Sequence, residues 1–208
     1  MSSSSLLFEV CLQSVDDAIA AQAGGAGRVE LCAALIEGGI TPSLGSINAC
    51  RDAVDIDIMV MIRPRGGDFR YTNAELDAMA QDIEHCKTIG VEGVVFGLLE
   101  IDGSIDQKHT QQLLELARPL SVTFHRAFDV AKDPIISLER LIEMGVNRVL
   151  TSGQAATAIE GKPLIRQLMQ QSAGRKDDYC VSAVSFAKIQ AETGFELPAL
   201  KDSQALYK

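Results

Sequence analysis

The segment TFHRAFD, residues Thr123–Asp129, places a histidine, an arginine and an aspartate within five positions. It directly follows the apolar stretch ARPLSV, which is typical of a buried strand that is about to end. A histidine beside Arg126 could act as a general base, as a metal ligand or as a hydrogen-bonding residue. Because the chain has only three histidines, we treat His125 and Asp129 as candidate catalytic residues and leave these roles open.

The pattern Glu-x-Cys occurs twice, at Glu9/Cys11 and at Glu30/Cys32. Residues two apart on a strand share a face, and neighbouring strands lie about 4.8 Å apart, so two thiols and two carboxylates can meet. Cys11 and Cys32 are therefore candidate ligands for a soft ion such as Cu(I), and Glu9 and Glu30 are candidate proton carriers. Zinc is less expected, since CxxC and HxxxH motifs are absent. The alternative is that both cysteines simply pack as small apolar side chains.

A second polar motif, RPRGGDF, carries Arg63, Arg65 and Asp68 at the end of an apolar run. Arginines in such a loop bind carboxylate or phosphate groups with two hydrogen bonds each, although a network of salt bridges at the strand end is an equal alternative. The segment LTSGQ adds backbone N–H groups and a hydroxyl that could hold an anion, or could form a simple turn. The candidate substrate-binding residues are Arg63, Arg65, Asp68, Arg126 and Ser152.

These motifs follow a regular alternation of apolar runs and helical stretches. The predicted strands cover 6–12, 28–34, 57–65, 91–99, 121–128 and 147–153. Near-continuous apolar strands indicate a parallel sheet that is buried on both faces, as in a (β/α) barrel or a doubly wound sheet. The segment QAGGAG precedes a strand and so does not match a dinucleotide-binding fingerprint. We therefore predict an α/β fold, a TIM-like (β/α) barrel with six recognisable βα units of eight.

Functional residues of such barrels lie at the carboxyl ends of the strands, which is where the polar motifs stand. Side-chain alternation predicts that Thr123 and His125 point into the barrel and that Val122 and Phe124 face the helices. Helix-end signals are clearest around 73–90, where we expect Asn73 to cap the helix and Gly90 to end it.

Composition limits the classes of function. The 208 residues are 47% hydrophobic, enough for one sizeable core, and the net charge of −9 argues against a nucleic-acid-binding surface. The first ten residues, MSSSSLLFEV, lack the features of a secretory signal, and no apolar stretch reaches the roughly 18 residues of a membrane span. Five cysteines without a compact framework are typical of a reduced, intracellular protein.

Taken in order, the motifs EVC, RVELCAAL, EGGITPSLG, VMIRPRGGDF, GVVFGLL, VTFHRAFD and RVLTSG resemble the CutC family, between about residue 7 and residue 175. The resemblance implies a TIM-like barrel, a cytoplasmic location and a homo-oligomer. It also implies that Cys11 and Cys32 match cysteines proposed as copper ligands in animal members. The resemblance implies no established enzymatic reaction.

The resemblance weakens near the carboxyl terminus. We assign residues 1–175 to the barrel domain and residues 176–208 to a divergent tail, in which 180–193 is expected to form one helix. Strands seven and eight are expected to be missing, and six units cannot close an eight-stranded barrel. The first and sixth strands should therefore be sheet edges that favour self-association.

Two functions remain in view. The first is a cytosolic copper-homeostasis protein that binds Cu(I) through Cys11 and Cys32. The alternative is a TIM-barrel enzyme of unknown reaction that acts on a small anionic metabolite, with arginines holding the anion and His125 or a carboxylate moving protons. The expected partners are a copper ion or a small anion and further copies of the chain, with no nucleic acid and no membrane.

Overall fold

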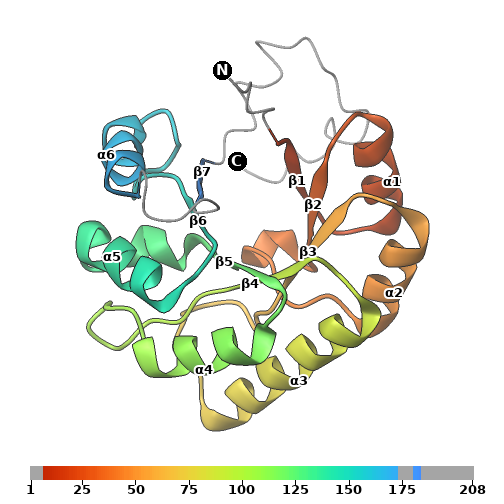
Figure 1. Cartoon of the computed structure of the whole chain (residues 1–208), viewed down its shortest axis with the longest axis horizontal. Helices are drawn as coiled ribbons and strands as arrows, with labels where there is room; N and C mark the ends of the chain where they lie inside the picture. The colour runs from red at the N-terminus through yellow and green to blue at the C-terminus, as the bar shows by residue number, and fades with distance from the viewer. Residues whose placement is uncertain (1–6, 173–179, 184–208) are drawn as a thin grey trace.

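The computed structural model describes residues 7–172 and 180–183, which form a parallel β-sheet curled around a common interior (Figure 1). The order of strands in the sheet follows their order in the chain, so each strand pairs with the next. The strands are β1 (Glu9–Leu12), β2 (Arg28–Leu31), β3 (Asp57–Met61), β4 (Gly93–Phe96), β5 (Ser121–Phe124), β6 (Arg148–Thr151) and β7 (Cys180–Ala183). Each of the six predicted strands is shorter than its apolar run. The motifs RPRGGDF and HRAFD therefore fall beyond the strand ends, whereas Glu9, Cys11 and Glu30 lie within β1 and β2.

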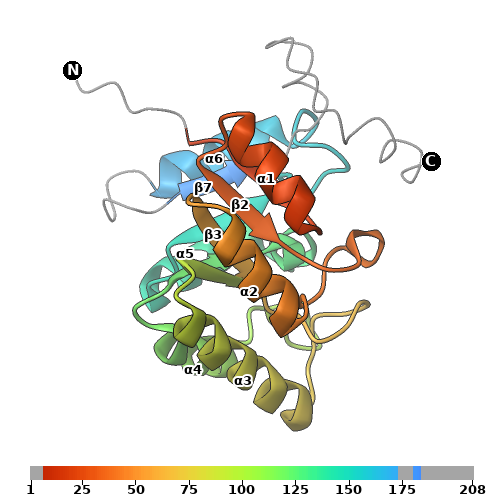
Figure 2. The same ribbon diagram turned by 90° about the vertical axis from the view of Figure 1, so that its right-hand side faces the viewer.

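Six α-helices alternate with the strands and cover the outer face of the sheet (Figures 1 and 2). They are α1 (Val15–Ala23), α2 (Leu44–Ala53), α3 (Asn73–Ile89), α4 (Gln107–Ala117), α5 (Pro134–Met144) and α6 (Lys162–Ser172). Within the described residues β1 pairs only with β2 and β7 only with β6, so the sheet is curled but open. The predicted fold class, an incomplete TIM-like (β/α) barrel, is confirmed.

The prediction from sequence and the structure differ in the segment that follows α6. We expected no further strand after the sixth and a helix over 180–193, but residues 180–183 form β7, which pairs with β6 in parallel. For these four residues the helix prediction is wrong, because the free backbone edge of β6 offers hydrogen-bond partners that a local sequence pattern does not reveal. Strand β6 is therefore not an edge strand. The remainder of the predicted tail lies outside the described residues.

Buried side chains form two clusters, one on the outer face of the sheet and one on its inner face. The larger one lies between sheet and helices and includes Val122 and Phe124, as the alternation predicted. The smaller one lies within the curl and consists of Cys32, Met59, Met61 and Val95, with Cys11 and Leu35 packed against it. The period of two thus sends the sulfur-bearing side chains in and directly after the first three strands, together with Val95 of β4, inward.

Local signals define the helix that supports the rim after β3. Thr72, and not Asn73 as predicted, caps α3, and its side chain and that of Glu75 form a reciprocal capping box. The error is one residue, because threonine and asparagine are both good N-caps and stand side by side here. Gly90 ends the helix in the left-handed conformation, as expected.

Candidate functional site

A cavity of about 420 Å³ opens at the carboxyl ends of the strands. Its walls come from β1, β2, β3 and β6 and from the segments that follow β2, β3 and β5. The lining residues are Cys11, Glu30, Leu35, Ile36, Glu37, Gly38, Met61, Arg63, Phe69, His125, Arg126, Ala127 and Leu150. This set combines thiol, carboxyl, guanidinium and imidazole groups with apolar side chains, which is the composition expected of a small-ligand site.

Three ligand atoms gather beside this cavity: Cys11 and Glu30 line it, and Cys32 is buried behind them. The Sγ atoms of Cys11 and Cys32 are 3.8 Å apart, and they lie 3.5 and 3.6 Å from Oε1 of Glu30. The β1–β2 register, which places Cys11 opposite Glu30, brings them together. The point equidistant from the three atoms is about 2.1 Å from each, close to the roughly 2.0–2.3 Å of metal–oxygen and metal–sulfur bonds. Among the described residues this is the group of three that could hold a metal ion.

The surroundings of the site raise the pKa values of all three groups. Burial first, and the charge of Glu9 second, raise the pKa of Glu30 to about 7. The hydrogen bond with Cys11, together with burial, raises the pKa of Cys32. The hydrogen bond with Cys32 lowers the pKa of Cys11, but burial and Glu30 outweigh it, so the net shift of that thiol is also upward. A bound cation must displace these protons, because thiolates and carboxylates are the ligating forms.

The buried side of the thiol pair is formed by apolar, sulfur-containing side chains. Met59 and Met61 are buried beside Cys32 in the inner cluster. Gly39 has a φ of +86°, and a Cβ placed there would lie 3.1 Å from Sγ of Cys32. A glycine in the left-handed region thus lets the loop backbone pass directly over the sulfur.

Glu9 faces the same interior but has its own partner. Its carboxylate forms an ion pair with Arg28, which is opposite it in the β1–β2 register. Its charge nevertheless raises the pKa of both Cys11 and Glu30. Glu9 therefore lies one side-chain layer below the thiol site and affects it through its negative charge.

Arg63 follows β3 and is 4% exposed. Its terminal nitrogens donate to the backbone oxygens of Glu37, Gly39 and Gly67, at 2.9, 3.0 and 2.9 Å. The guanidinium plane also lies 4.9 Å from the centre of the Phe69 ring. This side chain therefore ties the loop after β2 to the loop after β3 and forms part of the cavity wall.

His125, at the end of β5, is 3% exposed and lines the cavity, as the alternation predicted. Its Nδ1 accepts a hydrogen bond from the backbone N–H of Ala127, at 3.1 Å. The ring fits only because residue 97 is glycine, since a Cβ there would lie 2.5 Å from Nδ1. Burial, and then the charge of Arg63, lower the pKa of His125 to about 3.

The other two residues of the RPRGGDF motif lie away from this cavity. Arg65 pairs with Glu75 on α3 at 2.6 Å and with Asp68 at 3.0 Å. Asp68 is exposed and borders a separate surface pocket with Arg70 and Tyr71. The alternation of β3 does not continue to Arg65, because the chain leaves the strand after Met61.

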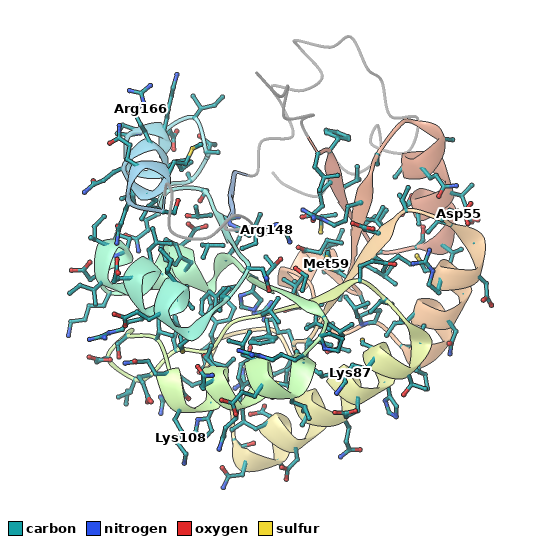
Figure 3. All side chains as sticks on the ribbon, in the orientation of Figure 1. Asp55, Met59, Lys87, Lys108, Arg148 and Arg166 are labelled. Atoms are coloured by element: carbon teal, nitrogen blue, oxygen red, sulfur yellow. The ribbon has the colours of Figure 1, made fainter. Side chains whose placement is uncertain are left out.

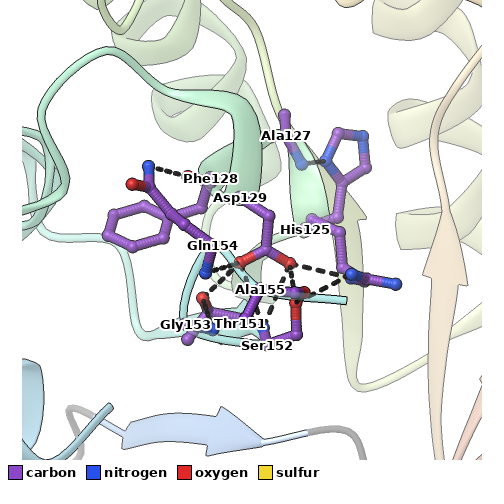
Figure 4. Close-up of polar contacts among 10 residues, drawn as sticks. His125, Ala127, Phe128, Asp129, Thr151, Ser152, Gly153, Gln154 and Ala155 are labelled. Carbon is purple, nitrogen blue, oxygen red and sulfur yellow. Dashed lines mark hydrogen bonds and ion pairs between the residues drawn. The ribbon is translucent and has the colours of Figure 1, made fainter. Parts of the chain in front are cut away.

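Asp129 is the centre of a polar network that joins the ends of β5 and β6 (Figure 4). Its carboxylate accepts hydrogen bonds from Arg126 Nε, from the Thr151 hydroxyl and from the backbone N–H groups of Ser152 and Gln154. These hydrogen bonds outweigh the effect of burial and lower the pKa of Asp129. The backbone N–H groups of the LTSGQ segment thus bind a carboxylate of the chain itself.

Arg126 and Ser152 belong to the same network. Arg126 Nη2 donates to the Ser152 hydroxyl at 2.8 Å, and Oγ of Ser152 also lies 2.7 Å from the carbonyl oxygen of Ala155. The Arg126 side chain is half exposed and borders the cavity. The network therefore fixes Arg126 at the cavity edge.

Several site residues had no sequence signal. Leu35, Ile36 and Glu37 form the short 3₁₀ helix η1 (Leu35–Glu37) in a stretch without periodicity. Phe69 and Leu150 reach the cavity from distant segments. Arg148, which donates to the Thr123 hydroxyl at 2.8 Å, could have been found from its parity with Leu150 on β6. Figure 3 shows Met59 and Arg148 on the concave side of the sheet and Lys108 and Arg166 pointing outward.

Comparison with known proteins identifies close relatives. The sequence model of the CutC family matches residues 6–197. A family protein CutC from Parabacteroides distasonis is 51% identical over 192 residues, which cover 90% of this chain and 79% of that protein. The copper homeostasis protein cutC homolog of Mus musculus is 52% identical over 169 residues, 81% of this chain and 62% of the mouse protein. The chain thus spans less than two thirds of the mouse protein's length.

Solved structures agree on the fold. A CutC crystal structure from Streptococcus agalactiae is 32% identical with a TM-score of 0.82, and the match covers 90% of this chain and 92% of that one. An aldolase that is 11% identical has a TM-score of 0.59 over 86% of this chain and 78% of its own, which shows a shared fold alone. In the part of the chain that the structure describes, no helix is long and apolar enough to cross a membrane.

Proposed function

This chain belongs to the CutC family, and on that premise we propose that it serves copper homeostasis by binding one Cu(I) ion through Cys11 and Cys32. The observation that carries the proposal is the thiol pair 3.8 Å apart with a carboxyl oxygen beside it, on the wall of an open cavity. The mouse and human relatives are named copper homeostasis proteins, which supports the same function here. Thiolates are preferred ligands of Cu(I), and Met59 and Met61 pack beside Cys32 on the buried side of the pair.

Each residue has a defined part in this proposal. Cys11 is half-buried and meets the ion first, while Cys32 holds it from the buried side. Glu30 supplies the third ligand oxygen. In the empty site near neutral pH both thiols are protonated and Glu30, with a pKa of about 7, is partly protonated. Binding therefore releases protons, and the affinity for Cu(I) should rise between pH 6 and pH 8.

The direct test is a titration of the reduced, metal-free protein with Cu(I) against a colorimetric chelator of known affinity. We expect one ion per chain, and a loss of at least about tenfold in affinity for Cys11→Ser and for Cys32→Ser. Cys86→Ser, a matched thiol-to-hydroxyl change in the buried face of α3, should bind like the wild type.

Two results would count against the proposal. One is an unchanged affinity for Cu(I) in both site variants. The other is an affinity for Zn(II) that equals that for Cu(I), because a site with a carboxylate ligand can also suit zinc. Equal affinities for Zn(II) and Cu(I) would leave the thiol site in place, but its assignment to copper would be wrong.

A cytoplasmic location and a homo-oligomeric state belong to the same proposal. Support for a reducing compartment comes from four described cysteines that are all free thiols. Support for an oligomer comes from the open curl of the sheet, in which β1 has one described neighbour. Light scattering coupled to size exclusion measures the oligomeric state directly, and a monomer at micromolar concentration would contradict it.

An enzymatic function is the second candidate, and the cavity is the observation that favours it. In this case His125, Glu30 and Glu9 are the proposed proton carriers, and Asp129 acts by positioning Arg126. Arg63 and Arg126 border the cavity, whereas Arg65, Asp68 and Ser152 would act only by supporting the loops. A thermal-shift screen of small anions tests it: the candidate fails if no anion stabilises the wild type more than Arg63→Ala.

A further inference from the structure

The cavity wall contains a buried positive charge that has no counter-charge in the described part of the chain. Arg63 is 4% exposed, and its three hydrogen bonds all go to backbone oxygens. Among the ion pairs of the described residues, none includes Arg63. Its Nε–H also finds no acceptor among these residues. A buried guanidinium is normally paired with an anion, because desolvation of an unpaired charge is costly.

His125 presents a second unpaired donor on the same wall. Because its Nδ1 accepts from Ala127, the ring proton of the neutral imidazole lies on Nε2. That nitrogen is buried and has no hydrogen-bond partner in the described part of the chain. The low pKa of His125, caused by burial and by Arg63, keeps the ring neutral at physiological pH. A neutral imidazole can donate its Nε2–H to a ligand, and it does not repel the positive charge of Arg63.

The Phe69 ring is a neighbour of both Arg63 and His125. The centre of the Phe69 ring lies 4.9 Å from the Arg63 guanidinium carbon and 5.0 Å from the His125 ring centre. Both N–H groups are shielded from solvent, so a ligand reaches them only if a neighbouring side chain moves, and the half-buried Phe69 ring is a neighbour of both residues. Burial raises the pKa of the Tyr71 hydroxyl to about 12, and the nearby guanidinium of Arg63 opposes that shift, but neither Tyr71 Oη nor Arg63 Nε has a well-aligned hydrogen-bond partner among the described residues. The missing acceptor is therefore not supplied by the described residues.

We propose that this cavity binds a small organic monocarboxylate whose oxygens accept the Nε–H of Arg63 and the Nε2–H of His125. Arg126 at the cavity edge is already paired with Asp129, so the groups that lack a partner are one positive charge and two N–H donors, which match the single charge and two oxygens of a carboxylate. The remaining wall includes Leu35, Met61 and Leu150, which suits a short apolar body rather than a phosphate dianion. The site is separate from the thiol pair in its chemistry, and the inference does not depend on copper binding.

The test uses metal-free full-length protein and three probes: butyrate, butyramide and inorganic phosphate. Isothermal titration should detect butyrate binding that is at least about tenfold tighter than that of either other probe, since a charged hydrogen-bond acceptor is lost in the amide. In protein labelled with ¹⁵N-histidine, butyrate should shift the Nε2–H signal of His125 and leave the signals of His85 and His109 unchanged. This second measurement requires no variant and therefore does not depend on the folding of one.

Paired variants locate the donor. His125→Asn keeps an acceptor for the Ala127 N–H but removes the Nε2 donor, and should weaken butyrate binding about tenfold or more. His125→Gln restores a donor at the position of Nε2 and should recover part of the affinity. Tyr71→Phe should bind butyrate like the wild type. Equal binding of butyrate and butyramide, or an unshifted His125 signal at saturating butyrate, would overturn the inference, whatever the Cu(I) titration shows.

Discussion

At the residue scale, the chemistry of the site follows from the burial of ionisable groups on the inner side of the curled sheet. Burial acts on both kinds of group: it holds a proton on Glu30 and removes one from His125. Neighbouring charges then add to burial, Glu9 in the first case and Arg63 in the second. Glu30 and His125 therefore make the folding stability depend on pH in opposite directions. Each dependence can be measured by replacing the residue that causes it.

Glu30→Gln should flatten the loss of stability of the metal-free protein between pH 4.5 and 7. The pKa of Glu30 is raised from 4.5 to about 7 in the folded protein, so the unfolded chain releases a proton that the native state retains. The stabilising contribution is complete below about pH 4.5 and is lost as the pH rises through about 7, on the order of 3 kcal/mol. Urea unfolding at several pH values measures this slope.

The matched control for this prediction is Glu115→Gln, the same change at an exposed position of α4. It should retain the slope of the wild type. A Glu30→Gln protein whose stability falls with pH as steeply as that of the wild type would show that the interior carboxyl is ionised or hydrated.

His125→Asn should weaken the acid sensitivity of the fold. The pKa of His125 is lowered from 6.5 to about 3, so the native state binds fewer protons than the unfolded chain in this window. The stability that depends on the neutral ring is present above about pH 6.5 and is lost as the pH falls through about 3. Asparagine does not titrate, so the variant should lose less stability than the wild type between pH 6.5 and 4. His85→Asn, exposed on α3, should behave as the wild type in the same acid titration.

At the element scale, the rim of the barrel is held by segments that begin where the strands end. The 3₁₀ helix η2 (Arg126–Val130) follows β5, and the turn after β6 folds against it. Asp129 joins the two, because its carboxylate accepts from Arg126, Thr151, Ser152 and Gln154. Gln154 has a φ of +54°, the left-handed conformation that points its N–H toward this carboxylate.

Asp129→Ala should lower the free energy of unfolding by roughly 3 kcal/mol or more, because several donors that face the carboxylate lose their acceptor in a mostly buried place. Asp129→Asn keeps one acceptor oxygen and should cost less. Asp77→Ala, exposed on α3, is the control and should change stability by less than about 0.5 kcal/mol. Urea denaturation measures all three. An Asp129→Ala protein as stable as the control would show that the network adds nothing to the fold.

At the scale of the whole molecule, the open curl is the main feature. Central strands of the sheet have two neighbours, whereas β1 has one among the described residues. Strand β6 is flanked by β5 and β7, so its backbone is paired on both sides. Protection against hydrogen exchange should follow this difference, since unpaired strand edges open more readily.

Hydrogen exchange in a dilute sample should therefore be faster in β1 than in β3 and β4. The amides of β6 should be protected to a degree similar to those of β3 and β4, because β7 covers the edge that six strands would leave open. Equal protection of β1 and β3 in a sample shown to be monomeric would mean that another segment of the chain covers β1. Slower exchange in β1 at higher protein concentration would instead indicate that a second copy covers it.

The sequence by itself determined the kind of fold and the region of the site. Alternation of apolar runs and helical stretches indicated the parallel sheet. A period of two placed His125 on an inward face and put Glu9 with Cys11, and Glu30 with Cys32, on shared faces. These properties could be derived because they depend on local backbone geometry and on chain order. The resemblance of the motifs to one family came from the same local stretches.

Only the tertiary structure decided which polar groups meet. Arg63 and Arg65 are alike in sequence, yet one is buried against loop carbonyls and the other pairs with α3. Ser152 and its backbone N–H look free to bind an anion until Asp129, 23 residues away, occupies them. Such contacts depend on how loops fold back across the strand ends, and no local period encodes that path. For this reason the cavity, and the two unpaired donors on its wall, could be found only in the folded chain.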